Sequence, residues 1–453
     1  MVKQKHLQKY YAGLDIAKRK INLCIIDLAD FRLDEEYDTS LDDLLRLKEQ
    51  LKQYSVEGAT YENTGVYSIP VTNILKDEIC VVPVHPADVK RKNQKKTDVS
   101  DAWWLANLLR SGTIGKDKGI DSSYIPDDKQ SDLRILTRMQ SRYTAQTNKH
   151  KNRITKVFDR TNIKIMTLFD DNNKFTKTAF AVYETLAEGK TWDEKITELQ
   201  TLRETATSNE RNILTRQIKF LSESQDELNF LIEHSVDKNL SENDRLEILF
   251  ELAQLKQLNY FLDNLEERIK HLVTNDEVFT EQMNLVTSIP GIGEETGPQI
   301  LAEIPPTTNF SSAKKFASLT GLVPSVQRSA NVVHIGKITK RGSKYLRKAF
   351  VQSAKVASMS PKQRLGRKAK LLFARKGKGK GKMVWTAIGR NLAEITYIIL
   401  RSKQSYKEEK FQKRTYKKVK TILNTKSVRE IAEQLRDRNY DVFIKDLSTN
   451  IAF

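Results

Sequence analysis

The first 112 residues alternate between strand-like and helix-like segments, which constrains the fold more than any other feature of the chain. Residues 11–17 and 21–28 are apolar runs on either side of a Lys-Arg-Lys turn, so they predict a β-hairpin. A helix-like segment then begins at Ser40, with Asp43 three residues later as in a capping box. A strand, a helix, a buried-type strand and a last helix follow. Strands that alternate with helices predict an α/β domain whose sheet is at least partly parallel.

Four acidic residues occupy unusual places in this pattern. Asp15 lies inside the first predicted strand, and Glu62 ends a later strand before an Asn-Thr-Gly turn. Asp98 and Asp101 begin the last helix and share one of its faces with two leucines. A helix cap explains one of these two carboxylates well and the second less well, and a bound divalent cation would neutralise both, so both interpretations stay open. Because sites in α/β sheets gather near strand ends and helix starts, the four acids can converge on two divalent ions suited to phosphoryl transfer.

The charge of the chain predicts a polyanionic partner. Its 453 residues carry a formal net charge of +19, with a pI near 9.5, which is typical of nucleic-acid-binding proteins. No Asp or Glu occurs between Glu303 and Glu394, although this interval is rich in Lys and Arg. Such one-sided charge favours a phosphate-binding surface over an ordinary solvated face. Since Mg²⁺ prefers oxygen ligands, any metal ligands are expected mainly outside this interval.

Cysteine usage and hydropathy indicate the cellular compartment in which the chain is expected to act. Cys24 and Cys80 are its two cysteines, without metal-ligand spacing or a disulfide framework, which suits a reducing intracellular compartment. We find no run of about 18 apolar residues and no signal-type apolar core at the N-terminus. The sequence therefore predicts a cytoplasmic chain without a membrane partner.

The middle of the chain is predicted to be helical. Apolar residues recur near helical spacing over residues 131–157, and residues 192–273 are rich in Leu, Glu and Lys. Two segments of the second region have the pattern of antiparallel or intermolecular coiled-coil hairpins. The core of a simple helical bundle explains the same pattern, so both interpretations stay open.

Two glycine-containing segments of the C-terminal third suit contacts with phosphate. SIPGIGEETGPQILAEI, from Ser288, has the pattern of a helix-hairpin-helix, in which the N–H groups around Gly291 and Gly293 can face a phosphate. An ordinary helix connection remains the alternative, because many turns contain Gly-x-Gly. Residues 374–385 form a basic, glycine-rich loop, and a basic tail with two predicted helices follows from about residue 402.

Three N-terminal motifs, GLDIAKRKI, YENTGVY and KKTDVSDAWWLANLL, resemble those of the DEDD-type insertion-sequence transposases. That family is related to the Piv-type DNA invertases and includes the RNA-guided bridge recombinases. The resemblance implies a RuvC-like, RNase H-type N-terminal domain with Asp15, Glu62, Asp98 and Asp101 as an acidic tetrad for Mg²⁺ or Mn²⁺. The second motif departs from the usual Glu-Ala-Thr-Gly, because Asn63 replaces its Ala.

A second resemblance covers FASLTGLVPSVQRSANVVHIGKITKRGSKYLRKAF in the C-terminal third. The residues that match the pattern of the family's second domain are Gly321, Leu322, Pro324, Ser329, Gly336, Ile338, Lys340, Gly342 and Arg347. In the family this serine is the nucleophile, so the resemblance implies that role for Ser329. Ser325 is the second candidate, because Ala330 stands where the family usually has Gly.

A serine hydroxyl is a weak nucleophile that needs a base or a metal ion. The residues around Ser329 include no acid, and His334 has no visible orienting partner. Help from a metal ion is therefore expected from the acidic tetrad, on another domain or another subunit. The resemblance further implies DNA as substrate, a structured guide RNA, and a homo-dimer or tetramer in the prokaryotic cytoplasm.

Together these features predict an α/β RNase H-like (RuvC-like) N-terminal domain, an α-helical coiled-coil middle and a mainly α C-terminal domain with a helix-hairpin-helix. The predicted boundaries are 1–125 for the RuvC-like DEDD domain, 126–285 for the helical region, 286–400 for the transposase domain with the serine, and 401–453 for the basic tail.

The predicted function is that of a transposase that cleaves and rejoins DNA through a covalent phosphoserine intermediate. One alternative is a RuvC-like, metal-dependent, structure-specific endonuclease without a covalent intermediate, and another is a non-catalytic nucleic-acid scaffold. The residues expected to contact nucleic acid are Gly291, Gly293, Arg328, Lys337, Lys340, Arg341, Lys344, Arg347, Lys378 and Lys380.

Overall fold

The computed structural model describes residues 9–29, 31–63, 65–89, 98–114, 120, 122–236, 240–329, 332–377 and 379–408. For residues 87, 98–100, 327–329, 332, 333 and 335 it describes the backbone alone. The chain divides into two compact units, Met1–Asp127 and Asp128–Phe453. None of the helices in the described ranges combines the length and apolar character that a membrane span needs.

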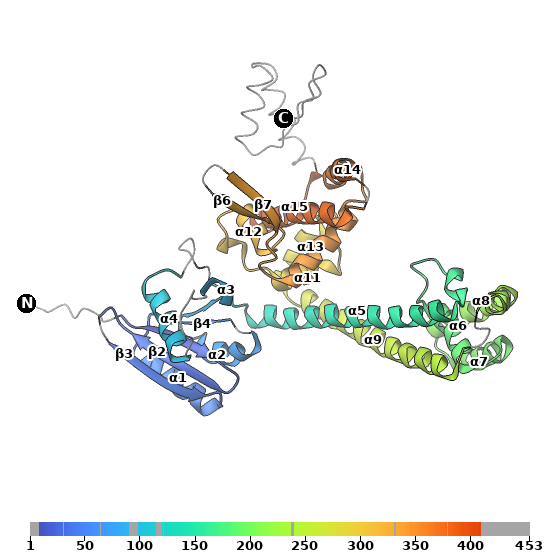
Figure 1. Ribbon diagram of the computed structural model, residues 1–453, viewed down its shortest axis with the longest axis horizontal. Helices are drawn as coiled ribbons and strands as arrows, with labels where there is room; N and C mark the ends of the chain where they lie inside the picture. The colour runs from blue at the N-terminus through green and yellow to red at the C-terminus, as the bar shows by residue number, and fades with distance from the viewer. Residues whose placement is uncertain are drawn as a thin grey trace, which may run out of the picture. The chain divides into compact units, whose positions relative to one another are not determined.

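The first unit is built on a five-stranded mixed sheet with the spatial order β3-β2-β1-β4-β5 (Figure 1). Its strands are β1 (Tyr11–Ile16), β2 (Lys20–Ile26), β3 (Arg32–Asp38), β4 (Gly58–Glu62) and β5 (Val81–Val84). Strand β1 pairs antiparallel with β2 and parallel with β4, and β4 pairs parallel with β5. The predicted α/β domain with a partly parallel sheet is therefore confirmed.

Helices cover both faces of this sheet. The helical elements are α1 (Leu41–Gln53), η1 (Gly65–Tyr67), α2 (Ser68–Leu75), α3 (Pro86–Val89) and α4 (Asp98–Arg110). Helices α1 and α2 pack on one face, where Leu14 and Tyr61 are buried with Leu47. Helix α4 packs on the other face, where its Ala102 is buried with Cys24 of β2. Because side chains alternate along a strand, odd-numbered positions of β1 face α4.

Strand β3 is a difference between the sequence prediction and the structure. Its residues, RLDEEYD, are mostly charged and did not suggest a strand. The exposed and less exposed positions alternate, and Tyr37 is the buried one. As the edge of the sheet, β3 needs only one apolar face, and charged residues on an edge strand discourage pairing with other chains.

The second unit is mostly helical, as predicted. Its elements are α5 (Asp128–Thr161), η2 (Lys164–Leu168), α6 (Lys177–Glu188), α7 (Trp192–Thr205), α8 (Ser208–Glu233), α9 (Glu242–Thr274), α10 (Glu277–Thr287), α11 (Thr296–Glu303), η3 (Thr307–Asn309), α12 (Ala313–Leu319), β6 (Pro324–Ser329), β7 (Val332–Ile338), α13 (Lys344–Ala357), α14 (Arg364–Lys376) and α15 (Gly381–Ser402).

Helices α5 and α9 run side by side within this unit (Figure 1). Helix α5 has 34 residues, which corresponds to about 50 Å at the usual rise per residue. Polar contacts join the pair, since Glu251 of α9 accepts hydrogen bonds from His150 and, at 3.0 Å, from Arg153. One apolar core forms with α6, α7 and α8, and a second forms with the helices from α10 to α15.

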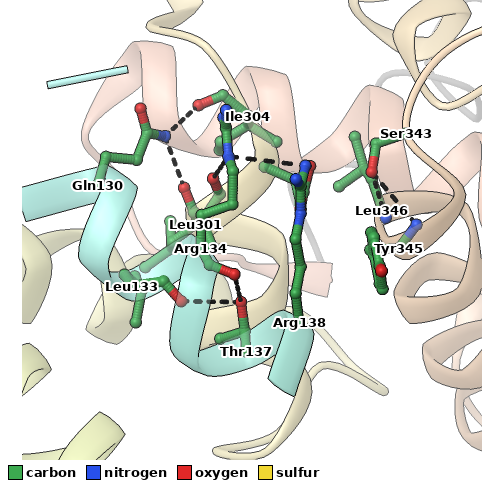
Figure 2. Close-up of polar contacts among 12 residues, drawn as sticks. Gln130, Leu133, Arg134, Thr137, Arg138, Leu301, Ile304, Ser343, Tyr345 and Leu346 are labelled. Carbon is green, nitrogen blue, oxygen red and sulfur yellow. Dashed lines mark hydrogen bonds and ion pairs between the residues drawn. The ribbon is translucent and has the colours of Figure 1, made fainter. Parts of the chain in front are cut away.

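The start of α5 is joined to the end of α11 by polar contacts (Figure 2). Gln130 and Glu303 are buried, whereas the Arg138 side chain is 42% exposed. The Gln130 side-chain amide donates to the carbonyls of Leu301, at 2.9 Å, and Ile304, at 2.7 Å. The Arg138 guanidinium donates to both carboxylate oxygens of Glu303, at 2.7 and 3.0 Å. The bonds from Gln130 satisfy carbonyls that a helix end leaves without intrahelical partners. The bonds from Arg138 neutralise Glu303, which is the last acid before the acid-free interval.

Candidate active site

Asp15 and Glu62 are placed by the parallel pairing of β1 with β4. In this register Leu14 lies opposite Tyr61, and each acid is the next residue along its strand. Neighbouring strands are about 4.8 Å apart, so the two acids lie next to each other at the carboxyl ends of β1 and β4. Since Leu14 and Tyr61 are buried on the face that α1 and α2 cover, the half-buried acids lie on the opposite face, under α4.

Helix α4 approaches β1 closely at Gly13, two residues before Asp15 and on the same face. A β-carbon at Gly13 would stand 2.0 Å from the Ala102 carbonyl oxygen and 2.5 Å from the Ala106 nitrogen. Real β-carbons do not approach other heavy atoms this closely, so only glycine fits here. The close approach fixes the distance between the helix and the strand that carries Asp15.

A second close approach gives the direction of α4 over the sheet. At the start of β4, a β-carbon at Gly58 would lie 3.4 Å from the Leu109 side chain. The end of α4 therefore lies over the starts of the strands, and its first turn lies over their carboxyl ends. This turn contains the backbone of Asp98 and the half-buried Asp101. The arrangement brings the first turn of α4 to the end of the sheet where the two strand acids lie.

Asp15, Glu62 and Asp101 thus lie on one face of the sheet at one end, with the backbone of Asp98, whose side chain is outside the description. Among the described residues, no group of three or more His, Cys, Asp and Glu is already arranged to hold a metal ion.

Asn22 is a polar residue of this face that the sequence patterns did not single out. It pairs directly with Asp15 across the β1–β2 hairpin, and it is 8% exposed. The turn between the strands is the signal that predicts this pairing, since it sets which β2 residue lies opposite Asp15. An amide here brings an oxygen acceptor and two N–H donors next to the carboxylates.

Beside these polar residues, part of the layer beneath α4 is apolar. Cys24 of β2 is buried there with Ala102 and Ala106, and burial raises the pKa of its thiol to about 12. Two side chains of α4 fix the helix further, since Arg110 donates to the Asp27 carbonyl at 3.1 Å. A similar bond joins the Trp104 indole to the Val89 carbonyl at 3.0 Å.

The serine candidates lie on the β6–β7 hairpin of the second unit. Ser329 ends β6 and pairs with Val332, the first residue of β7, so its backbone is next to the turn. Its side chain is outside the description. Ser325 lies nearer the base, and its hydroxyl would be 2.4 Å from a β-carbon at Gly336. Gly336 therefore leaves the space that the Ser325 side chain occupies across the hairpin.

The two hairpin glycines between α10 and α11 differ in their surroundings. Gly291 has a φ of 92°, and a β-carbon there would be 2.4 Å from the Ser353 carbonyl oxygen of α13. Gly293 has no atom within 4 Å of the position of a β-carbon, and its N–H donates to the Thr296 hydroxyl at 3.1 Å. Gly291 thus serves packing, whereas Gly293 lies beside open space.

The predicted basic contact residues also differ in exposure. Lys337, Lys340, Arg341, Lys344 and Lys380 are exposed, and Arg347 is half-buried. The side chain of Arg328 and all of Lys378 lie outside the description. The half-buried position of Arg347 sets it apart from the other predicted phosphate contacts.

Comparison with family models matches both regions. A model of the DEDD-type transposases of IS110 elements, described as "Transposase", matches residues 12–163. A second model, described as "Transposase IS116/IS110/IS902 family", matches residues 283–369. The first range includes the four acids, and the second includes the glycine hairpin and the serine hairpin.

The chain is also similar to curated proteins over about a third of its length. It is 31% identical over 146 residues to the "Pilin gene-inverting protein" of Moraxella bovis, which is 32% of this chain and 45% of that protein. It is 29% identical over 138 residues to the "Transposase for insertion sequence element IS1328" of Yersinia enterocolitica, which is 30% of this chain and 40% of that protein. The aligned part is thus less than half the length of either relative.

Proposed function

Because the chain belongs to the DEDD-type transposase family of IS110 elements, we propose that it cuts and rejoins DNA strands as the transposase of an insertion sequence. The observation that carries this proposal is the arrangement of the acids in the first unit. Two acids end neighbouring parallel strands, and the first turn of α4, which contains two more, lies over the same end of the sheet.

The acids fit a divalent cation by their chemistry and by their support. Asp15 and Glu62 project from strands, and Asp101 projects from a helix that Gly13 holds against the sheet. Carboxylate oxygens are the ligands that Mg²⁺ and Mn²⁺ prefer. When bound between Asp15, Glu62, Asp98 and Asp101, such ions supply charge stabilisation for the attacking and leaving oxygens of a phosphoryl transfer. The positive end of the α4 dipole lessens the repulsion among the acids.

The proposed nucleophile is the Ser329 hydroxyl. Its Oγ forms a bond to a backbone phosphorus, and its proton passes to a general base or to solvent. The bond between the phosphorus and a deoxyribose oxygen breaks, and the leaving hydroxyl takes up a proton. The product is a phosphoserine diester, which retains the energy of the broken bond. Attack by another DNA hydroxyl then forms the new strand and restores the serine.

The proposal also assigns roles to the other predicted features. Exposed lysines and arginines of the acid-free interval bind phosphates of DNA and of a structured guide RNA, and the open space at Gly293 leaves room for a backbone to approach. The formal net charge of +19 supports binding of both nucleic acids. The long α5–α9 pair acts as a coiled coil that joins subunits into a dimer or tetramer.

Cleavage assays with matched variants test the proposal. Duplex DNA and RNA copied from the flanks of the gene would be incubated with Mg²⁺ and with wild type, D101N, S329A or S325A. We expect D101N and S329A to lose strand cleavage and S325A to retain it. Cleavage by S329A that still depends on Asp101 would instead support a metal-dependent nuclease that uses water, and cleavage by D101N at the wild-type rate would contradict both functions.

A further inference from the structure

The β6–β7 hairpin is held in place mainly at its base. Neither strand packs extensively against another described element, and Val326 is 52% exposed. Two backbone hydrogen bonds close the base, from Thr339 to the Val323 carbonyl at 2.9 Å and from Lys340 to the Gly321 carbonyl at 3.1 Å. The direction in which the hairpin points is therefore set where the chain enters and leaves it.

Two glycines let the entering and leaving segments touch. Gly321 has a φ of 66°, and a β-carbon there would be 2.3 Å from the Arg341 carbonyl oxygen. Gly342 has a φ of 99°, and a β-carbon there would be 1.9 Å from the Leu319 carbonyl oxygen. Any other residue at either position would be strained by its backbone angle and would push the two segments apart.

Arg347 of α13 joins both segments through one guanidinium nitrogen. Its Nη1 donates to the Thr320 carbonyl at 3.4 Å, before the hairpin, and to the Lys340 carbonyl at 3.2 Å, after it. The neighbouring Leu346 and Phe350 are fully buried, so α13 is a fixed support. A guanidinium directs several N–H groups in one plane, which suits it to hold two carbonyls in a set geometry.

We propose that Arg347 is a positioning residue that sets where the hairpin presents Ser329. This inference rests on the proposed function of Ser329. A six-residue strand such as β6 is about 20 Å long, so a tilt of about 10° at its base moves its far end by about 3 Å. Since misplacement of a reacting group by about 1 Å can lower a rate about 100-fold, the contact at the base controls the reaction at the tip.

The obvious alternative role for Arg347 is a direct contact with a DNA phosphate, as for the exposed Lys337 of β7. The two roles predict different measurements. Loss of a phosphate contact lowers DNA affinity and the dependence of affinity on salt. Loss of a positioning contact lowers the rate of the chemical step at saturating DNA and leaves both binding quantities unchanged.

The test compares R347K, R347A and K337A with wild type in the full-length protein. It measures amide hydrogen exchange of the hairpin, affinity for fluorescent DNA copied from the gene's flanks at several salt concentrations, and the rate of protein–DNA adduct formation at saturating DNA. R347K keeps the positive charge, so it still tests the proposal if R347A does not fold.

We expect R347K and R347A to slow adduct formation by about tenfold or more, with faster exchange at Thr339 and Lys340 and unchanged DNA affinity. K337A should weaken DNA binding and leave hairpin exchange unchanged. The proposal is overturned if R347A behaves as K337A does, or if R347K matches wild type in both exchange and rate. If wild type forms no adduct, the proposed function of Ser329 fails. Unchanged amide hydrogen exchange of the hairpin in R347A would refute the positioning role of Arg347 but not the proposed function.

Discussion

Gly13 of β1 lies so close to Ala102 of α4 that a β-carbon at residue 13 would be 2.0 Å from the Ala102 carbonyl oxygen. This contact connects the strand that carries Asp15 to the helix that carries Asp98 and Asp101. Because Gly13 has no side chain, the strand and the helix that carry the acids can lie this close together.

Substitution of Gly13 by Ala tests this contact. We expect G13A to reduce the free energy of unfolding by about 1–3 kcal/mol, because α4 must move away from the sheet. The same shift should abolish DNA cleavage. Chemical denaturation measures the loss, with G293A as the control, since a β-carbon at Gly293 meets nothing within 4 Å. Equal stability of G13A and wild type would contradict the close packing.

The acids are expected to bind a divalent cation in the absence of DNA. Mn²⁺ should raise the melting temperature of wild type, because a ligand that binds only the folded state stabilises it. D15N and D101N should reduce this shift. The control is D42N, which changes an exposed acid in the first turn of α1. A shift that persists in D15N and D101N, or that is lost in D42N, would argue against the site.

The two cysteines are expected to differ in reactivity towards a thiol reagent. Burial raises the pKa of Cys24 to about 12, so at about pH 8 only about one Cys24 thiol in ten thousand is ionised. Since the protonated thiol is favoured up to that pKa, raising the pH to about 9 should change the reactivity of Cys24 little. One thiol, the exposed Cys80, should react rapidly, and the second should react only after unfolding. Two rapid equivalents in the native protein would be inconsistent with a buried Cys24.

Glu303 is expected to be important for the stability of the second unit. Its side chain is 3% exposed, and its partner Arg138 would lose both hydrogen bonds in E303A. We expect E303A to cost about 1–3 kcal/mol, because Arg138 loses two hydrogen bonds to a carboxylate but is 42% exposed and can be hydrated. E281A, which removes an exposed ion pair with Lys403, should change stability by less than about 1 kcal/mol. Similar unfolding curves for E303A and E281A would disprove the role of Glu303.

Much of the first unit could be predicted because its local signals agree with each other. The apolar runs around the Lys-Arg-Lys turn gave the β1–β2 hairpin, and Ser40 indeed caps α1 by accepting from the Asp43 N–H. Strand β3 could not be predicted from its own residues, since it is stable only as the edge of a sheet that other segments form.

Relationships between distant residues were harder to predict. The apolar pattern of α9 predicts a coiled-coil hairpin or a helical bundle, but nothing local to that pattern indicates that α9 lies beside α5. The sequence marks Arg347 as a motif residue and an expected nucleic-acid contact, but it does not show the two backbone carbonyls to which Arg347 donates. Charge patterns indicate that a surface binds phosphate, but they do not indicate which cations have internal partners.

The most direct test of the central claim is the identity of the residue that becomes linked to DNA. Wild type, S329A and S325A would be incubated with flank-derived DNA and RNA and Mg²⁺, digested with protease, and analysed by mass spectrometry for nucleotide-linked peptides. We expect a phosphodiester-linked peptide that contains Ser329, present in wild type and S325A and absent in S329A. DNA cleavage without any linked peptide, or a link that S329A retains, would contradict it.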